Sequence, residues 1–225
     1  MKADLRNGGL VVRLESVHRS LSSAVLGGGL SSIRTWFNLQ VDASHDCDDP
    51  VADLRKACIG LADPVVGMLT AAKVDRFTTA AQRSAHVVTT VGLKRPITAA
   101  APLPPNVDPV GTINLLAVVD VDLTDEGLVN ALQTAVEAKA QALASAGVAA
   151  LNSDGFATGT ATDSICVVCP RGETVKYCGP ATPHGHDLAQ AVYRAVLAGI
   201  VAYREAKSSP LDAREGVMGN RRSTM

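Results

Sequence analysis

The chain has 225 residues, of which 47% are hydrophobic, 19% are charged and only 3% are aromatic, and its formal net charge is -1. This length fits one domain of ordinary or slightly large size, and the apolar fraction is close to that of a folded globular protein. A nearly neutral chain with few aromatic residues lacks the basic patch and stacking surface of a nucleic-acid-binding protein. No segment approaches the ~20 unbroken apolar residues of a membrane span. Neither nucleic acid nor membrane is therefore an expected partner.

The N-terminus and the cysteines indicate the cellular compartment. The opening residues, MKADLRNGG, lack the apolar segment of a secretory signal. Five cysteines, an odd number without framework spacing, are typical of reduced thiols in a cytoplasmic protein. We therefore expect the protein to be cytoplasmic.

Hydrophobic patterning predicts strands and helices along the whole chain. In chain order, strands are expected at 9–15, 34–41, 65–72, 85–91, 112–120, 164–168 and 174–178, and helices at 51–61, 125–146 and 187–207. The segment 101–110 carries four prolines and reads as an extended connector. We predict an α/β or α+β fold, with a mixed β-sheet and helices packed on its faces. It would form a single two-lobed domain over 1–207, with halves joined near 101–110 and a disordered tail at 208–225.

The helix expected at 125–146 carries one charge out of place. Thr124 is a suitable N-cap, and two acidic residues follow it in the first turn, where the helix dipole favours them. Apolar side chains form a stripe at helical spacing, and Lys139 projects from within that stripe. Either its methylene stem packs while its ammonium reaches water, or the ammonium points into a site where a carboxylate or substrate holds it.

A second polar group lies in the segment ATGTATD. Thr158, Thr160 and Thr162 alternate, which places their three hydroxyls on one side if the backbone is extended. Gly159 permits a close approach of a ligand or another chain segment, and Asp163 ends the row. The alternative is a β-turn whose threonines satisfy local backbone groups.

Several separate blocks resemble the adenosylcobinamide amidohydrolase family. The strongest are GTINLLAVVDVDLTDEGLVNALQTAVEAKAQAL, ATGTATDSICVV and YCGPATPHGHDLAQAVYRAV. Weaker ones are RTWFNLQV, GMLTAA and VVTTVGLKRP, and together the blocks cover roughly 30–202 in the family's order.

The resemblance implies an enzyme that hydrolyses the amide linking the corrin ring to aminopropanol in adenosylcobinamide. The product would be adenosylcobyric acid for cobalamin salvage. The corrinoid would be a small-molecule substrate, so no cofactor is expected, and metal dependence stays open. The alternatives are a non-catalytic corrinoid-binding or carrier protein and a hydrolase of another amide.

A corrinoid is fringed with amide side chains, which hydroxyl and amide groups of the protein would suit. Within the resembling blocks we therefore expect substrate contacts from threonines, asparagines and one histidine. These are Asn38, Thr70, Asn114, Thr134, Thr158, Thr160, Thr162 and His184.

Amide hydrolysis needs an activated nucleophile, a proton donor for the leaving amine and donors for the oxyanion. In one arrangement, cleavage between Gly111 and Thr112 exposes Thr112, whose free α-amine then acts as the base. In a second, Asp163 or Glu137 is the base on a water molecule and Lys139 steers charge. Thr112, Glu137, Lys139 and Asp163 are accordingly the candidate catalytic residues.

A metal site is a third arrangement. The segment HGHD at 184–187 and the group His45, Asp46 and Asp49 have metal-binding residue types, although zinc would need further ligands and an open position for water. The alternative for the first is a glycine turn leading into the last helix. We assign no metal ligand.

A cysteine nucleophile is the fourth arrangement. Cys166 and Cys169 form a CxxC pair, but a strand places them on opposite faces, so packed thiols are expected. Cys47 lies in a polar loop among aspartates, which would raise the pKa of a thiol and reduce its reactivity.

The final helix has one apolar face. Leu188, Val192, Ala195, Val196 and Gly199 share it. This face either packs in the core or forms a homodimer interface.

Overall fold

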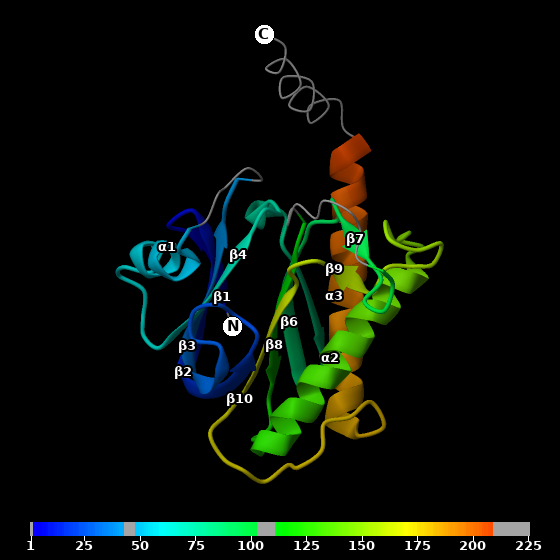
Figure 1. The fold of residues 1–225 in the computed structure, drawn as a ribbon. Coiled ribbons are helices and arrows are strands. Elements are labelled where there is room, and N and C mark those ends of the chain that lie inside the picture. The colour runs from blue at the N-terminus through cyan, green and yellow to red at the C-terminus, as the bar shows by residue number, and fades with distance from the viewer. Residues whose placement is uncertain (1, 43–47, 103–110, 209–225) are drawn as a thin grey trace.

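The computed structural model describes residues 2–42, 48–102 and 111–208 (Figure 1). Most of the proline-rich connector, the loop holding His45, Asp46 and Cys47, and the tail beyond 208 lie outside these residues. Within the described ranges, no helix combines the length and apolar character that a bilayer crossing requires.

An eight-stranded mixed sheet forms the centre of the molecule, in the order β4-β3-β2-β10-β8-β6-β5, and β1 pairs with β2. Its strands are β1 (Lys2–Arg6), β2 (Gly9–Ser22), β3 (Gly29–Gln40), β4 (Val65–Thr70), β5 (Thr78–Gln82), β6 (Ala85–Val91), β8 (Ile113–Val119) and β10 (Ser164–Cys169). A small second sheet pairs β7 (Pro96–Ile97) with β9 (Gly159–Thr160). The pairs β3–β4 and β8–β10 are parallel and the others antiparallel, so the predicted mixed sheet is confirmed.

Helices cover the sheet from two sides (Figure 1). They are α1 (Pro50–Ala57), α2 (Asp125–Ser145) and α3 (Pro183–Ser208), with a short 3-10 helix, η1 (Val74–Arg76). The long helices α2 and α3 pack on β5, β6, β8 and β10 through an apolar cluster that includes Leu115, Leu128 and Val192. At the other end of the sheet, Leu54 of α1 packs on Phe37 of β3. The predicted α/β architecture is therefore confirmed.

The opposite face of the sheet curls around a second apolar cluster. Trp36 and Met68, from β3 and β4, share this cluster with Leu116 of β8, although two other strands separate β3 from β8 in the sheet. The side-chain amide of Asn114 on β8 also donates to the carbonyl oxygen of Leu69 on β4, at 2.8 Å. The curl thus brings the end of β4 beside the start of β8.

The alternation along β8 explains how one strand serves both clusters. Successive side chains of a strand point to opposite faces, so Leu115 and Ala117 face α2 and α3 while Leu116 and Val118 face the interior of the curl. Asn114 belongs to the second set, and it is fully buried. A polar group is therefore held on the inner face at the start of β8.

Several element predictions are corrected. No strand forms at 174–178, where Val175 makes one isolated bridge with Leu123. The strands β1 and β5 were not expected, and α3 begins at Pro183 rather than at 187. Thr124 does cap α2, accepting a hydrogen bond from the Gly127 amide at 3.2 Å. The apolar face of α3 lies in the core, so its predicted packing role is confirmed.

Candidate active site

A buried ion pair joins α2 to the start of β10. Lys139, only 6% exposed, contacts the Oδ2 atom of Asp163 through its ammonium group. On α2, the neighbours of Lys139 one turn away on either side are Ala135 and Ala142, both buried. Their small side chains leave room for the lysine stem to run inward along the helix surface. Of the three charged candidates on α2 and before β10, Lys139 and Asp163 thus meet, whereas Glu137 is exposed and does not join them.

The carboxylate of Asp163 accepts four hydrogen bonds from the protein, two at each oxygen. Its Oδ1 atom accepts from the Ile113 amide at 2.9 Å and from the Thr160 hydroxyl. Its Oδ2 atom accepts from Lys139 and from the Thr160 amide at 3.1 Å. An ionised carboxylate offers about four acceptor sites, so the protein already fills those of Asp163. This geometry suits a group that positions its neighbours better than a base that binds water.

Gly159 makes this ion pair possible. A β-carbon at this position would lie 2.5 Å from Oδ2 of Asp163 and 2.8 Å from Nζ of Lys139. Both distances are closer than van der Waals contact allows, so any larger residue would displace the pair. The close approach expected at Gly159 is therefore made by side chains of the same chain.

Two threonine hydroxyls converge on one backbone carbonyl beside the ion pair. The Thr160 hydroxyl lies 2.8 Å from the carbonyl oxygen of Gly111, and the Thr162 hydroxyl lies 3.3 Å from it. The hydroxyl of Thr112, the next residue, contacts the Thr162 hydroxyl. Thr112 is 4% exposed. A buried hydroxyl, a carbonyl and two further hydroxyls are thus gathered at one peptide bond.

The backbone at Gly111 requires glycine. Its φ is +124°, which lies in the region that other residues rarely adopt. A β-carbon there would also lie 3.1 Å from backbone atoms of Gly92, Lys94 and Arg95. Packing against this loop fixes the direction in which the Gly111 carbonyl points.

Buried amides continue the polar region along the inner face of the curl. Asn114 donates to Oδ1 of Asn38 at 2.7 Å, and Asn38 donates to the Thr90 hydroxyl at 2.9 Å. The Oδ1 atom of Asn114 has no hydrogen-bond partner among the described residues. A buried acceptor of this kind calls for a donor from water or a ligand. Thr70, also buried, accepts from the Ala72 amide at 3.0 Å.

Thr90 was not anticipated by the sequence analysis. Its signal was present, because two threonines follow two valines in the strand β6, at positions that its burial pattern keeps inside. That signal alone did not show which partner across the curl the hydroxyl would meet. The Gly111 carbonyl was missed for a different reason, since side-chain patterns carry no information on backbone acceptors.

Three other candidates lie apart from the ion pair. Glu137 is exposed on α2. The Thr134 hydroxyl is bonded to the carbonyl oxygens of Asn130 and Cys178, at 3.0 and 2.9 Å, which ties α2 to a loop. The Thr158 hydroxyl accepts from a loop amide at 3.0 Å, and only Gly159 and Thr160 of the threonine row are in a strand. The catalytic role of Glu137 and the substrate contacts of Thr134 and Thr158 remain predictions.

His184 lies at the opposite end of β8. Its Nδ1 atom is 3.1 Å from the hydroxyl of Ser84, which donates to Oδ2 of Asp187 at 2.9 Å. The Ser84 carbonyl accepts from the Asp120 amide just beyond β8. Seven residues of strand separate this end from Thr112, roughly 20 Å. The structure therefore does not bring His184 to the ion pair.

Within the part of the chain that the structure describes, neither a metal-binding group nor a reactive cysteine adds to this site. The described residues contain no group of three or more His, Cys, Asp or Glu side chains placed to hold a metal ion. Cys166 and Cys169 are buried in separate apolar clusters on opposite faces of β10. Burial raises the pKa of the Cys166 thiol to about 12 and that of Cys178 to about 11, so both remain protonated near neutral pH. The loop with Cys47 is outside the described residues.

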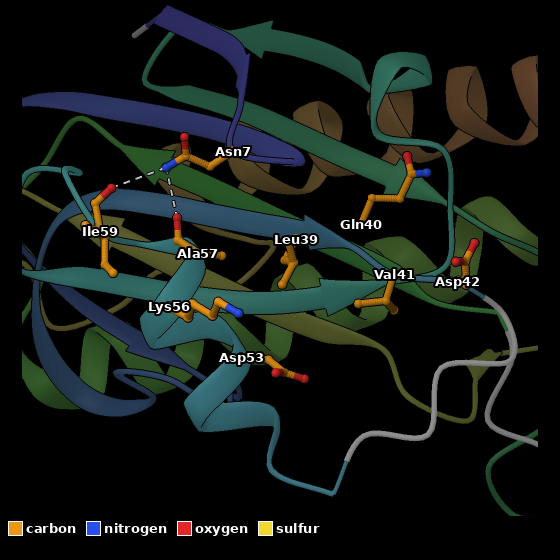
Figure 2. Close-up of a pocket in the computed structure, with 9 residues that line it drawn as sticks. All are labelled: Asn7, Leu39, Gln40, Val41, Asp42, Asp53, Lys56, Ala57 and Ile59. Carbon is orange, nitrogen blue, oxygen red and sulfur yellow. Dashed lines mark hydrogen bonds between the residues drawn. The ribbon is translucent and has the colours of Figure 1, made fainter.

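Figure 2 shows a pocket of about 630 Å³ between α1 and the end of β3. Its wall includes Leu39 and Gln40, which follow the buried Asn38 on β3, and the charged residues Asp42 and Lys56. The volume falls in the range of small-molecule sites. None of its lining residues belongs to the ion pair or to the threonine group, so this pocket beside β3 is separate from that site.

Comparisons with known proteins identify the family. A family model described as adenosylcobinamide amidohydrolase matches residues 1–208. A Halobacterium salinarum protein named adenosylcobinamide amidohydrolase is 32% identical over 209 residues, covering 88% of this chain and 81% of the relative. A Methanosarcina mazei protein with the same name is 26% identical over 183 residues, covering 79% and 88%. An uncharacterised Methanocaldococcus jannaschii protein is 33% identical over 99 residues, covering 44% and 39%. The chain belongs to the adenosylcobinamide amidohydrolase family and is a hydrolase that acts on an amide.

Proposed function

We propose that this chain hydrolyses the amide that joins the corrin ring to aminopropanol in adenosylcobinamide. The products would be adenosylcobyric acid and aminopropanol, and the first would return to cobalamin synthesis. Family membership over residues 1–208 is the observation that carries this proposal. The names of the Halobacterium and Methanosarcina relatives support the choice of substrate.

The reaction is assigned to the group of residues around the Gly111–Thr112 peptide. Asp163, bonded to Lys139 and Thr160, acts as a positioning residue that fixes the loop before β10. Thr112 supplies a hydroxyl, and the Thr160 and Thr162 hydroxyls are the nearest donors for a developing oxyanion.

The substrate is expected to meet the amides on the inner face of the curl. Asn114 lies two residues after Thr112, and alternate residues of an extended segment point to the same side. Its buried, unpartnered Oδ1 atom is an acceptor suited to a carboxamide N–H of the corrin ring, which would reach it only if the inner face opens to admit the substrate. Asn38 and Thr70 extend this polar wall towards β4.

Incubation of the purified protein with adenosylcobinamide tests the proposal. Chromatography with mass spectrometry should detect adenosylcobyric acid and aminopropanol in equal amounts. A parallel reaction with a chelator should proceed at the same rate if the described residues supply the chemistry. Tight binding without turnover would contradict hydrolysis and favour a corrinoid carrier, whereas hydrolysis of a different amide would contradict the substrate.

A further inference from the structure

We propose that the chain cleaves its own peptide bond between Gly111 and Thr112, and that the new N-terminal Thr112 is the nucleophile of the amidohydrolase. The first half stands on the geometry of the intact peptide bond. The second half deepens the proposed function and depends on it.

The intact peptide occupies the place of a substrate acyl group. The Gly111 carbonyl oxygen receives the Thr160 and Thr162 hydroxyls at 2.8 and 3.3 Å, as an oxyanion would. Thr112 as a whole is 4% exposed, and its hydroxyl contacts that of Thr162. A separate substrate therefore has little access to it while Gly111 remains attached. Cleavage would remove this obstruction and create an α-amine next to the hydroxyl.

Counting hydrogens gives one consistent assignment of hydrogen-bond donors and acceptors among the threonine hydroxyls. A hydroxyl carries one hydrogen, so if Thr162 donates to the Gly111 oxygen, the contact with Thr112 requires Thr112 to donate to Thr162. In this arrangement the Thr112 hydroxyl donates its proton to Thr162, and Thr162 donates to the Gly111 oxygen. The lone pairs of the Thr112 oxygen are left for attack. The Thr160 hydrogen is shared between Asp163 and the Gly111 oxygen.

The cleavage proceeds in steps that balance. The Oγ atom of Thr112 bonds to the carbonyl carbon of Gly111 while its proton passes to Thr162 and the Thr162 proton passes to the Gly111 oxygen. The C–N bond then breaks, the C=O bond re-forms, and that proton moves to the Thr112 nitrogen, which leaves an ester. One solvent water hydrolyses the ester, giving a Gly111 carboxyl group and a Thr112 hydroxyl with a free α-amine.

The released Thr112 would then repeat the chemistry on the substrate. Its hydroxyl adds to the amide carbonyl of the corrinoid while the α-amine takes the hydroxyl proton. The α-amine then gives this proton to the departing aminopropanol nitrogen. Water hydrolyses the resulting ester. The Thr160 and Thr162 hydroxyls, no longer bonded to Gly111, would serve the substrate oxygen.

Intact mass spectrometry of the purified protein is the direct test. Two chains should appear, 1–111 and 112–225, whose summed mass exceeds that of the uncut chain by one water. Thr112→Val, which keeps the shape and removes the hydroxyl, should give one uncut chain, and Thr112→Ser should still be cut. Thr162→Val should slow cleavage on the order of 100-fold, as loss of one oxyanion donor does. Thr98→Val, which removes a hydroxyl bonded to the Phe156 carbonyl instead, is the matched control and should be cut normally.

Further readouts separate this proposal from folding effects and from the proposed function. Hydroxylamine should trap the ester as a Gly111 hydroxamate. Circular dichroism checks that Thr112→Val is folded. If that variant is unfolded, the other proteins still test the proposal. Folded wild-type or Thr112→Ser protein that stays uncut would overturn it. A single uncut chain that hydrolyses adenosylcobinamide would refute self-cleavage and leave the proposed function standing. A cleaved protein that does not hydrolyse adenosylcobinamide would refute the proposed function and leave self-cleavage standing.

Discussion

The two ends of β8 both carry polar and titratable side chains, but they are built differently. At the first end, Asp163 holds Lys139 and Thr160, and the hydroxyls beside it point at a peptide carbonyl. At the far end, Asp187 and His184 both bond to Ser84. There the aspartate receives a serine hydroxyl and the histidine does not bridge to it, so the order of a catalytic triad is absent.

The difference shows that residue types alone do not identify a site. Serine, histidine and aspartate sit together at the far end, yet their contacts join the start of α3 to the turn before β6. Threonine, lysine and aspartate at the first end have less familiar chemistry, but they surround an atom that could react. We therefore propose catalysis at the first end and expect a stabilising role for the second.

The largest effect is expected from breaking the buried ion pair. Lys139→Met leaves the Asp163 charge buried without its partner, which should lower the free energy of unfolding by about 3–5 kcal/mol. Misplacement of the hydroxyls should also reduce kcat/KM for adenosylcobinamide on the order of 100-fold. Urea unfolding and product chromatography measure the two effects.

The double variant Lys139→Met with Asp163→Asn is the control for that experiment. Removing both charges should restore most of the stability, because no unpaired charge remains buried. Activity should stay low, because the amide cannot accept the same four hydrogen bonds. If activity returned with stability, the first end would be a scaffold like the second.

Crowding the ion pair should have the next largest effect. Gly159→Ala places a methyl group within 2.8 Å of both charged groups, which should cost about 1–3 kcal/mol of stability. The matched control is Gly155→Ala, whose β-carbon would meet its nearest neighbour at 3.6 Å. Equal thermal unfolding midpoints for the two variants would show that the Lys139–Asp163 ion pair can shift to accommodate the methyl group, which would contradict the prediction.

A smaller effect is expected at the far end of β8. His184→Ala removes the contact with Ser84 and should lower stability by about 1 kcal/mol, the usual net worth of a hydrogen bond. Because β8 separates this residue from Thr112, kcat/KM should change less than about 3-fold for a site roughly 20 Å away. A loss of activity above that level would break the comparison and return His184 to the substrate contacts.

The smallest effect concerns Cys166, which lies on β10 between the two ends. Burial raises the pKa of its thiol from 9.0 to about 12 in the folded protein. Below pH 9 the thiol is protonated in both states and its contribution to stability is fully present. As the pH rises from 9 towards 12, the unfolded chain loses the proton first, so stability falls, by about 1 kcal/mol at pH 9.5.

Urea midpoints of wild type and Cys166→Ala, each at pH 7.5 and 9.5, isolate this contribution. The wild-type midpoint should fall more steeply with pH than that of the variant, because the variant has no thiol to ionise. Parallel losses in the two proteins would show that other groups cause the alkaline destabilisation.

The sequence supplied the elements wherever the hydrophobic period was long and regular. The start of α2 followed from the Thr124 cap and acidic first turn, and β8 followed from an apolar run that only Asn114 interrupts. The β1–β2 hairpin was missed although Asn7 and Gly8 form its turn with positive φ, a recognised hairpin signal. Its first strand is short and exposed, so no apolar alternation marked it.

Chemistry at the site was partly readable in the same way. Lys139 stood out because a charge within an apolar helical stripe must find a partner, and Asp163 was the carboxylate that ended the threonine row. Glu137 was equally visible, but helical geometry turned it to solvent. What pattern could not show was that Asp163 is saturated by four donors, since two of these are backbone amides.

The sequence by itself therefore determined the family, the main helices and strands, and the residue types of the candidate site. These follow from local periodicity and short motifs, which depend on neighbours along the chain. Only the tertiary structure decided that β4 curls back to β8, that Asn38 meets Asn114, and that two hydroxyls converge on Gly111. Such contacts join residues 45 to 76 positions apart, and their geometry is set by how the sheet curls around its apolar core.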